Sequence, residues 1–475
     1  MEMKMLLKAR QLALYSLVFL LSALFYSTPL LAAKELSVDL NDVIKLTLKN
    51  NSEIQASKAA SRSADASMKQ ARGHYGPVLS VSSNVLFWDK ESTMSLGGDS
   101  SALSQLPAPQ TPYEMAFAGL MDGLSKPTTL QEDITSTTQL TAAMPLNQLY
   151  QIHQGYKVEK LNKQIAEDTL GGTSSDKVLS ATEAYFRLLQ AKAQNDTAQK
   201  AVEHLEEQMR IVEVSLEHGI LALKDKLRMS VALADSRQKL IQAKSNVDLA
   251  RVNLLTIMGV DLDTSVDAKS ISGEVPGKPI LSVDEGVMKA VTGRYEIKQL
   301  KRNVEQADRG RKAAIANMLP NFALMGAYQH QEGVKMGAQD SLYGGLVVAW
   351  DFWEWGSTYY GIAKNKETRN RLSHLKKHAE RMVALQVRKA YIDFQTAFET
   401  IKVTEAAVAQ AEEAFSIESE NFASGMGTTA DVLDAESALT QAQNNNHAAL
   451  FQCFIAKATY IRSTGEMITA DKIVN

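Results

Sequence analysis

The sequence predicts an α+β membrane protein in which short amphipathic strands from several copies of the chain form one barrel, continued by long α-helices. Three observations predict this fold: a secretory signal pattern, an internal repeat over almost the whole chain, and unusually long heptad-patterned helices. The chain has 475 residues and a formal net charge of −3, with charges of both signs mixed along it. This distribution lacks the clustered basic surface that nucleic-acid binding requires.

The N-terminal segment 1–33 is predicted to be a signal peptide. Basic residues precede a nearly unbroken apolar run over 12–26, and small residues follow up to Ala33. A run of about 15 residues is short for a spanning helix, which needs roughly 20. We expect cleavage after Ala33. The single cysteine, Cys453, cannot form an intramolecular disulfide.

The two halves of the mature chain are predicted to be structural repeats. The Leu-Ser-Val-Asp segment 36–39 recurs at 281–284. After small gaps, matches follow at an offset of 243 residues and later of 206. The offset changes across a loop rich in Ser, Pro, Thr and Gly, roughly 90–135, whose counterpart is only about 332–341. Insertions of this kind occur at solvent-facing loop tips. The predicted organisation is a first repeat over 34–260, a linker over 261–283 and a second repeat over 284–475.

Each repeat is predicted to supply two amphipathic strands. Leu79, Val81 and Val85 alternate with polar residues after Pro77, which ends the preceding helix. Four strands cannot close a transmembrane barrel, which starts at about eight, and lipid tolerates no open edges. Several copies must therefore share a barrel; a dimer would give about eight strands and a trimer about twelve. The strands are expected at about 77–88, 136–147, 320–331 and 342–352.

The tryptophans favour a membrane location for these strands. All four stand at the ends of predicted strands: Trp88, Trp350, Trp353 and Trp355. Aromatic residues form girdles at both interfaces of outer-membrane barrels, so we expect these four at the membrane interfaces. The alternative, a soluble β-core, does not explain why the predicted helices contain no tryptophan.

The remaining segments are predicted to be helices of a coiled coil. Phe394, Ile401, Val408, Phe415 and Phe422 are seven residues apart, and a strict seven-residue repeat imposes a left-handed supercoil. A helix of about 65 residues is roughly 100 Å long. The expected helices are 39–75, 153–218 with a break at Gly171-Gly172, a continuation after Gly219 to about Met258, and 284–318, 358–423 and 430–462.

Further motifs mark the turns between these elements. Pro77 and Pro320 stand at the helix-to-strand turns, the strand 346–352 leads to Gly356, and 422–435 reads FASGMGTTADVLDA. Because these motifs occur together in this order and alongside the repeat, the chain resembles the TolC family of outer-membrane efflux proteins over nearly all of its mature length. The resemblance implies a homotrimer with a twelve-stranded barrel in the outer membrane and a helical tunnel in the periplasm. It also implies docking to a periplasmic adaptor (membrane fusion) protein and an inner-membrane transporter or secretion ATPase.

The resemblance also implies two sites at the inner end of the tunnel. Family members contact the adaptor through the hairpin turns, which correspond here to Gly219, Ile220, Leu221, Gly425, Met426 and Gly427. Family members also narrow the aperture of the tunnel with acidic side chains. Asp431 and Asp434 match these positions, and Asp225 is the counterpart of Asp431 in the first repeat. Residues three apart share a helix face, so a trimer would place six carboxylates of Asp431 and Asp434 around one opening. The alternative is that Asp431 only caps the helix that follows Gly427.

The sequence shows no convincing catalytic, metal or cofactor motif. His374 and His378 could share a metal ion, but the glutamate of the zinc-protease motif is missing. The predicted function is a passive outer-membrane channel of a tripartite efflux or type I secretion system, and not an enzyme. The alternative is a periplasmic structural or adhesive coiled-coil protein.

Overall fold

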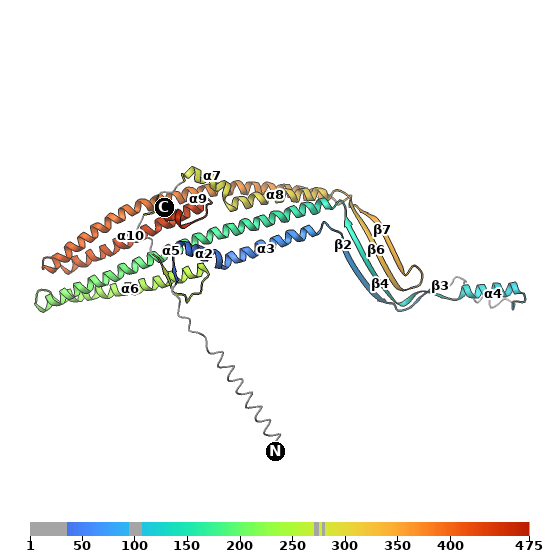
Figure 1. Cartoon of the computed structure of the whole chain (residues 1–475), viewed down its shortest axis with the longest axis horizontal. Coiled ribbons are helices and arrows are strands. Elements are labelled where there is room, and N and C mark those ends of the chain that lie inside the picture. Colours follow the sequence, from blue (N-terminus) through green and yellow to red (C-terminus); the bar gives the residue numbers. More distant parts are fainter. Residues whose placement is uncertain (1–35, 95–106, 270–274, 278–280, 475) are drawn as a thin grey trace, which may run out of the picture. The chain divides into compact units, whose positions relative to one another are not determined.

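A computed structural model describes residues 36–94, 107–269, 275–277 and 281–474 (Figure 1). The predicted signal peptide, 1–33, lies outside the described residues. The chain divides into two compact units, which are described separately. The first unit takes in the described residues of Met1–Ala56, Gly172–Gly293 and Val383–Asn475, and the second those of Ser57–Gly171 and Arg294–Met382.

The second unit contains the main sheet. Four strands lie in the order β2-β4-β6-β7, each antiparallel to its neighbour (Figure 1). Among the described residues, β2 and β7 each pair along one edge only. The strands expected from the alternation therefore form one sheet, in which segments of both repeats are neighbours. Their bounds are β2 (Val78–Phe87), β4 (Thr128–Pro145), β6 (Asn321–Val334) and β7 (Asp340–Ala349).

The stretch expected as a loop, about 90–135, contains regular structure in its described part. Strand β3 (Ser92–Met94) pairs with β4, which begins at Thr128 and not near residue 136. Between them lies helix α4 (Pro112–Ser125). Thr111 and Glu114 form a capping box and proline occupies the first helical turn, which together start the helix. The expectation of a loop over the whole of this stretch was wrong for these residues.

The second unit also contains α3 (Ser52–Gly73) from residue 57, α8 (Tyr295–Ala316), and parts of α5 (Leu149–Glu217) and α9 (Ser357–Ala423). The expected break of α5 at Gly171-Gly172 was wrong, because α5 is continuous for 69 residues. A Cβ on Gly171 would lie 2.4 Å from Cε1 of Tyr295. The glycine therefore provides room for the α8 tyrosine ring against α5.

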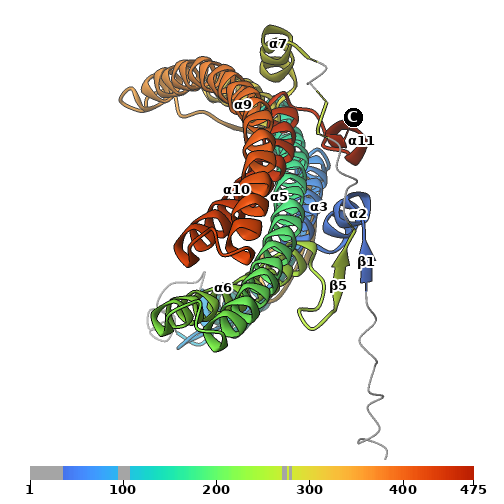
Figure 2. The ribbon, with the colours of Figure 1, turned by 90° about the vertical axis from the view of Figure 1, so that its left-hand side faces the viewer.

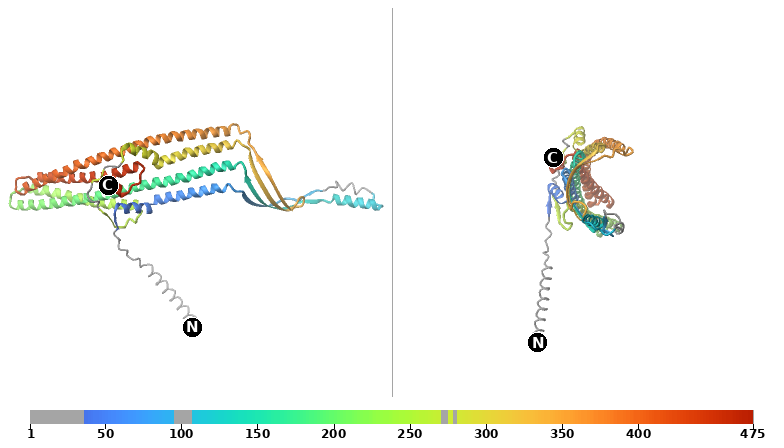
Figure 3. Two further views of the ribbon diagram at one scale, coloured as in Figure 1. Left: turned by 45° about the horizontal axis from the view of Figure 1, so that its top comes forward. Right: turned by 90° about the vertical axis from the view of Figure 1, so that its right-hand side faces the viewer.

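In the first unit, α5 and α9 continue and each turns into an antiparallel partner, α6 (Leu223–Met258) and α10 (Thr429–Ser463) (Figure 3). Beside α5 lie α2 (Leu40–Asn50) and the parallel pair of β1 (Leu36–Val38) and β5 (Val266–Ala268) (Figure 2). Phe186 of α5 stacks on Phe454 of α10 at 4.8 Å between ring centroids, within the core that joins these elements. The unit also contains α7 (Val283–Gly293) and α11 (Ala470–Val474).

The helices expected over 39–75 and 284–318 are each divided in two. Asn51 separates α2 from α3: its Oδ1 accepts hydrogen bonds from the amides of Glu53 and Ile54 at 3.0 and 3.2 Å. Its Nδ2 donates to the carbonyl of Ile257 at 2.8 Å, so the buried break is fixed by α6. Both α2 and α3 recur as α7 and α8 at an offset of 243 residues. Within the described residues, no helix combines the length and apolar composition needed to cross a membrane.

Candidate functional site

The strand register sorts the side chains of the sheet onto two different faces. Val81, Leu140 and Tyr328 are successive cross-strand partners and therefore share one face. Val81 on this face is 70% exposed in the single chain. Such a continuous apolar surface requires an apolar environment. Other apolar members of this face include Leu79, Val85, Phe87, Ile134, Met144, Phe322, Leu324, Leu342, Leu346 and Val348.

The opposite face of the same strands is mainly polar, with a few apolar residues such as Leu86 and Val347. Ser82, Gln139, Gln329 and Ser341 are cross-strand partners on this face, one position away from the apolar set. Nε2 of Gln139 donates to the hydroxyl of Tyr343 at 2.7 Å, also on this face. A sheet with one apolar and one polar face can separate lipid from an aqueous lumen.

The four tryptophans mark both ends of the strands. Trp88 follows the end of β2 that is remote from the helices, whereas Trp350, Trp353 and Trp355 follow the end of β7 that leads into α9. Nε1 of Trp88 donates to Oγ1 of Thr135 at 3.0 Å, and Nε1 of Trp350 to the carbonyl of Met318 at 3.3 Å. Ten residues of a tilted strand span about 25 Å, the height of the apolar band of an outer-membrane barrel.

The turns of the two helical hairpins have the same geometry. Gly219 and Gly425 both have left-handed φ angles, 73° and 78°, at the ends of α5 and α9. The next amide, of Ile220 or Met426, donates to a carbonyl five residues back at 2.8 Å in each case. This is the Schellman motif, which stops a helix in a defined conformation. Two copies of one turn therefore occur at an offset of 206 residues.

The side chains at these turns differ in exposure. Ile220 and Met426 are exposed large apolar side chains at the tips. Leu221 is half-buried and packs against a cluster formed by α5, α6, α9 and α10. A Cβ on Gly427 would lie 3.1 Å from the Phe422 amide nitrogen, so this glycine permits a tight return of the chain. Each tip thus presents a protruding apolar side chain, Ile220 or Met426, on a rigid turn, and Leu223 is also exposed close to the first turn.

The three aspartates near these turns have different roles in local structure. Oδ2 of Asp431 accepts hydrogen bonds from the hydroxyl and the amide of Thr428, at 2.6 and 3.1 Å. These bonds lower the pKa of Asp431, the hydroxyl contributing most. Asp225 accepts only from the amide of Ala222, at 3.3 Å, because alanine has no hydroxyl. Asp434 is exposed.

Asp431 therefore takes part in capping this helix, and its carboxylate remains exposed to solvent. Thr428 is the residue that the sequence interpretation missed. Its spacing from Asp431, a hydroxyl residue three positions before an acidic one, is the sequence signature of a capping box.

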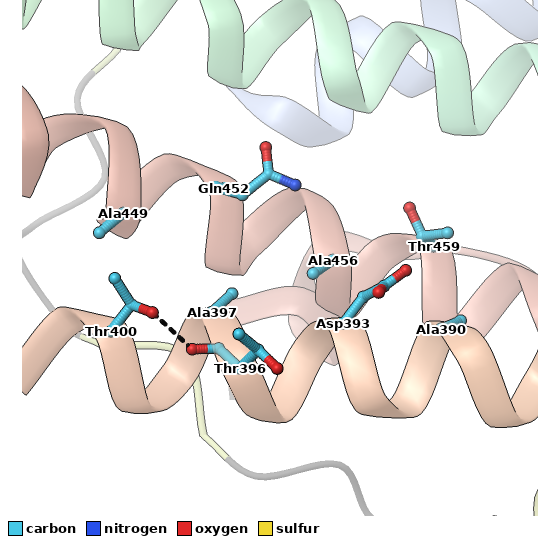
Figure 4. A pocket seen from close by; sticks show the side chains of 9 residues that line it. All are labelled: Ala390, Asp393, Thr396, Ala397, Thr400, Ala449, Gln452, Ala456 and Thr459. Atoms are coloured by element: carbon cyan, nitrogen blue, oxygen red, sulfur yellow. Dashed lines mark hydrogen bonds between the residues drawn. The ribbon is translucent and has the colours of Figure 1, made fainter.

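A shallow groove runs between α9 and α10 (Figure 4). Its volume is about 370 Å³, and alanine and threonine side chains form most of its wall. Asp393 projects into it from α9 and Gln452 lies on α10 (Figure 4). Small side chains let a further helix approach closely, so the groove is suited to helix packing.

A second groove, between α5, α6 and α10, has a volume of about 440 Å³. Glu436 lies at its wall, where burial raises the pKa of the carboxyl group and Thr440 donates to Oε1 at 2.8 Å. Across the described part of the chain, no group of three or more His, Cys, Asp or Glu side chains is arranged to hold a metal ion.

Comparison with known sequences gives one family. The model of the family described as "Outer membrane efflux protein" matches residues 43–260 and 287–466. No curated protein sequence gives a significant match.

Several solved structures share the fold. The outer-membrane channel OprN is 16% identical, covers 90% of this chain and 89% of its own, and superposes with a TM-score of 0.72. CmeC of Campylobacter jejuni is 16% identical, with 90% and 85% covered and a TM-score of 0.72. VceC of Vibrio cholerae is 16% identical, with 90% and 96% covered and a TM-score of 0.71. At these identities the likeness concerns the fold.

Proposed function

Because the chain belongs to the outer membrane efflux protein family, we propose that it is the passive outer-membrane duct of a tripartite export system. The chain is an outer-membrane channel of the kind that serves efflux, with a trimeric barrel and a helical tunnel in the periplasm. The predicted fold class, family and location are therefore confirmed.

The open sheet supports the shared barrel. In the described chain β2 and β7 each have one unpaired edge. Unpaired backbone groups are not tolerated in lipid, so β7 of one protomer would pair with β2 of the next. Three copies of four strands give a barrel of about twelve, with the polar face inward.

The paired turns carry the proposal for an adaptor. Proteins of this family are trimeric and generally work with periplasmic adaptors and inner-membrane pumps. We assign the docking role to Gly219, Ile220, Leu221, Gly425, Met426 and Gly427. A trimer would present six rigid turns with a protruding apolar side chain each, which matches a partner that binds by shape and apolar contact.

The aspartates support a cation-sensitive aperture. Asp431 and Asp434 are exposed and lie within one turn of each other at the start of α10, directly after one docking turn. Asp225 occupies the equivalent place on α6. Rings of carboxylates attract and retain cations, so we assign these three residues to the aperture.

We also propose that the two repeats, 34–260 and 284–475, are joined by the linker 261–283. The recurrence of α2 and α3 as α7 and α8 supports this division, as does the match of the family model in two blocks. The described part of the linker includes β5, which pairs with β1. The signal peptide 1–33 would bring the chain to the periplasm, and energy would come from the inner-membrane partner, whether a transporter or a secretion ATPase.

A site-specific crosslinking experiment tests the adaptor proposal. A photocrosslinker placed at Met426 in cells should give an adduct with a periplasmic protein, and that adduct should contain a membrane-fusion adaptor by mass spectrometry. The same probe at Tyr113, on the other side of the membrane, is the control and should give no such adduct. Export that persists in the Met426 variant without any adaptor adduct would remove the docking role.

A further inference from the structure

Helix α4 is exposed on all sides in the single chain. It is connected to the sheet through β3 and the start of β4, at the strand ends remote from the long helices (Figure 1). None of its 14 residues is buried. Because the long helices are periplasmic, the opposite strand ends, and α4 with them, lie at the outer surface.

Four of the large apolar residues of α4 follow a coiled-coil seam, while Met115 is exposed on another face of the helix. Tyr113, Phe117, Leu120 and Leu124 are spaced by four, three and four residues, which is the a/d spacing of a heptad. All four are exposed, from 38% for Leu124 to 90% for Tyr113. A scattered set of exposed apolar residues needs no explanation, but a periodic stripe on one helix face does.

The helix also needs a partner for its stability. Isolated helices shorter than about 12–15 residues are marginal in water. Gly119 and Gly123 stand inside α4, and each costs about 1 kcal/mol relative to alanine. A Cβ on either glycine would have no neighbour within 4 Å in the single chain. The two glycines therefore weaken the isolated helix.

The charges of α4 argue against the membrane surface as that partner. Helices that lie on membranes carry Lys and Arg on their polar face. Between Pro112 and Ser125 there is no basic residue, and the two charged residues, Glu114 and Asp122, are both acidic. A second copy of α4 is uncharged along its seam and offers the same apolar spacing.

The trimer brings three such helices together. Twelve strands about 4.8 Å apart and tilted by about 40° enclose a barrel about 24 Å wide. Three helices of about 10 Å diameter pack into a bundle roughly 20 Å across. We propose that the α4 helices of the three protomers join through this seam as a three-helix cap over the outer mouth of the channel. Tethering in one trimer makes the association intramolecular, which compensates for the short seam.

The cap would restrict the outer mouth in the resting channel. Exported molecules would leave when the short bundle separates, which a seam of two heptads permits because its stability is small. The inference rests on the trimeric channel, and its test must separate the cap from the channel.

Disulfide trapping in the intact trimer tests the cap. Leu120→Cys places a thiol on the seam, and Asp122→Cys places one on the opposite face of the same helix as the matched control. Cys453 is buried, and burial raises the pKa of its thiol to about 12, so it adds little background. Under mild oxidation, Leu120→Cys should give disulfide-linked dimers on a heated, non-reducing gel, several-fold more than Asp122→Cys.

Other outcomes would overturn the proposal. Trimers that stay intact on an unheated gel but give no Leu120→Cys dimers would exclude the cap while leaving the channel. Equal crosslinking by both variants would indicate random collisions between α4 helices and no defined seam. A fluorophore at position 120 that is quenched by brominated lipid in proteoliposomes would place α4 on the membrane. Loss of the trimer itself would instead contradict the channel.

Discussion

Thr428 and Asp431 hold each other at the start of α10. The Thr428 hydroxyl donates to Oδ2 of Asp431 at 2.6 Å, and the Asp431 amide donates back to Oγ1 of Thr428 at 3.3 Å. This reciprocal capping box fixes the first turn of the helix. Asp434, one turn further, has no part in it. The two carboxylates assigned to the aperture therefore differ in what their removal should do.

We expect Asp431→Ala and Asp434→Ala each to weaken channel block by multivalent cations severalfold, because each removes three carboxylates from the trimer. Only Asp431→Ala should also lower the temperature at which the trimer dissociates, because it opens the capping box. Single-channel recording in planar bilayers and gels of stepwise heated samples measure the two effects. Asp122→Ala in α4 is the control and should change neither. Unchanged block in Asp434→Ala would contradict its place in the aperture.

The pH dependence of Asp431 follows from its hydrogen bonds. Thr428 lowers the pKa of this carboxyl group in the folded protein, so the unfolded chain holds the proton to higher pH. The stabilisation is complete above the ordinary aspartate pKa of about 3.9 and is lost as the pH falls through the lower folded value. In Asp434→Ala channels, we expect cation block to persist when the pH is lowered to about 3.9. Block that is already lost at about pH 5 would contradict this ordering.

The glycines at the hairpin turns should be sensitive for a backbone reason alone. No atom lies within 4 Å of a Cβ built on Gly219 or Gly425, so alanine would clash with nothing. Their positive φ angles nevertheless disfavour an L-residue by roughly 1–2 kcal/mol. We expect Gly219→Ala and Gly425→Ala each to lower the dissociation temperature of the trimer and to reduce export. Asparagine, which tolerates this conformation better, should recover part of the loss.

Gly293→Ala provides the control for the turns. Its Cβ would also meet no atom within 4 Å, and its φ is not in the left-handed region. The dissociation temperature of this variant should match that of the unmodified protein. If all three alanine variants behaved alike, strain at the turns would not be the cause.

The repeating local patterns in the sequence are the reason that most of the fold could be predicted. The alternation of apolar and polar residues around Val81 reflects the two-residue period of a strand. The apolar residues seven apart from Phe394 onward reflect coiled-coil packing. Both patterns can be recognised in the sequence without knowledge of tertiary contacts. The places of Trp88 and Trp350 at strand ends follow from the same patterns. These signals are local, and the structure bears out the strand around Val81, β2, and the long helix from Phe394, α9.

What could not be predicted depends on contacts between distant segments. Two successive glycines are typical of a helix break, but Gly171 instead makes room for the ring of Tyr295, which is 124 positions away in the sequence. Asn51 interrupts a helical pattern because Ile257 accepts its side-chain hydrogen bond. At the proposed aperture, the position of Asp431 near the turn could be predicted from the sequence. Its hydrogen bond with the Thr428 hydroxyl became clear only from the geometry of the first helical turn.

Lys457 should be replaceable with a gain in stability. Its side chain on α10 is only 3% exposed, and Nζ has no hydrogen-bond acceptor among the described residues. Burial lowers the pKa of this amine, which means that the charged form is unfavourable in the folded protein. Lys457→Met keeps the shape and removes the charge, so we expect the free energy of unfolding to rise by about 1–3 kcal/mol, the cost of a buried polar group without a partner.

The pH dependence distinguishes this cause from better packing. Because the folded pKa is below the unfolded value of about 10.4, the unfolded chain binds more protons between the two. The stability of the unmodified protein should therefore rise as the pH increases through the folded pKa, and that of Lys457→Met should not. Denaturant unfolding at several alkaline pH values measures this difference. Lys239→Met, at an exposed lysine paired with Asp235, is the control and should change stability by less than about 0.5 kcal/mol.

Val81 and Ser82 are adjacent on β2 and test the assignment of the two sheet faces. Val81 belongs to the apolar face and Ser82 to the polar face, and both are exposed in the single chain. An arginine facing lipid near the middle of the bilayer costs about 2–4 kcal/mol, whereas one facing an aqueous lumen can remain hydrated. Val81→Arg should therefore reduce the trimer recovered from the outer-membrane fraction, since three copies carry the cost. Ser82→Arg should assemble normally and alter ion selectivity in bilayers. The reverse pattern would mean that the polar face meets the lipid, and equal recovery of both variants would mean that neither face does.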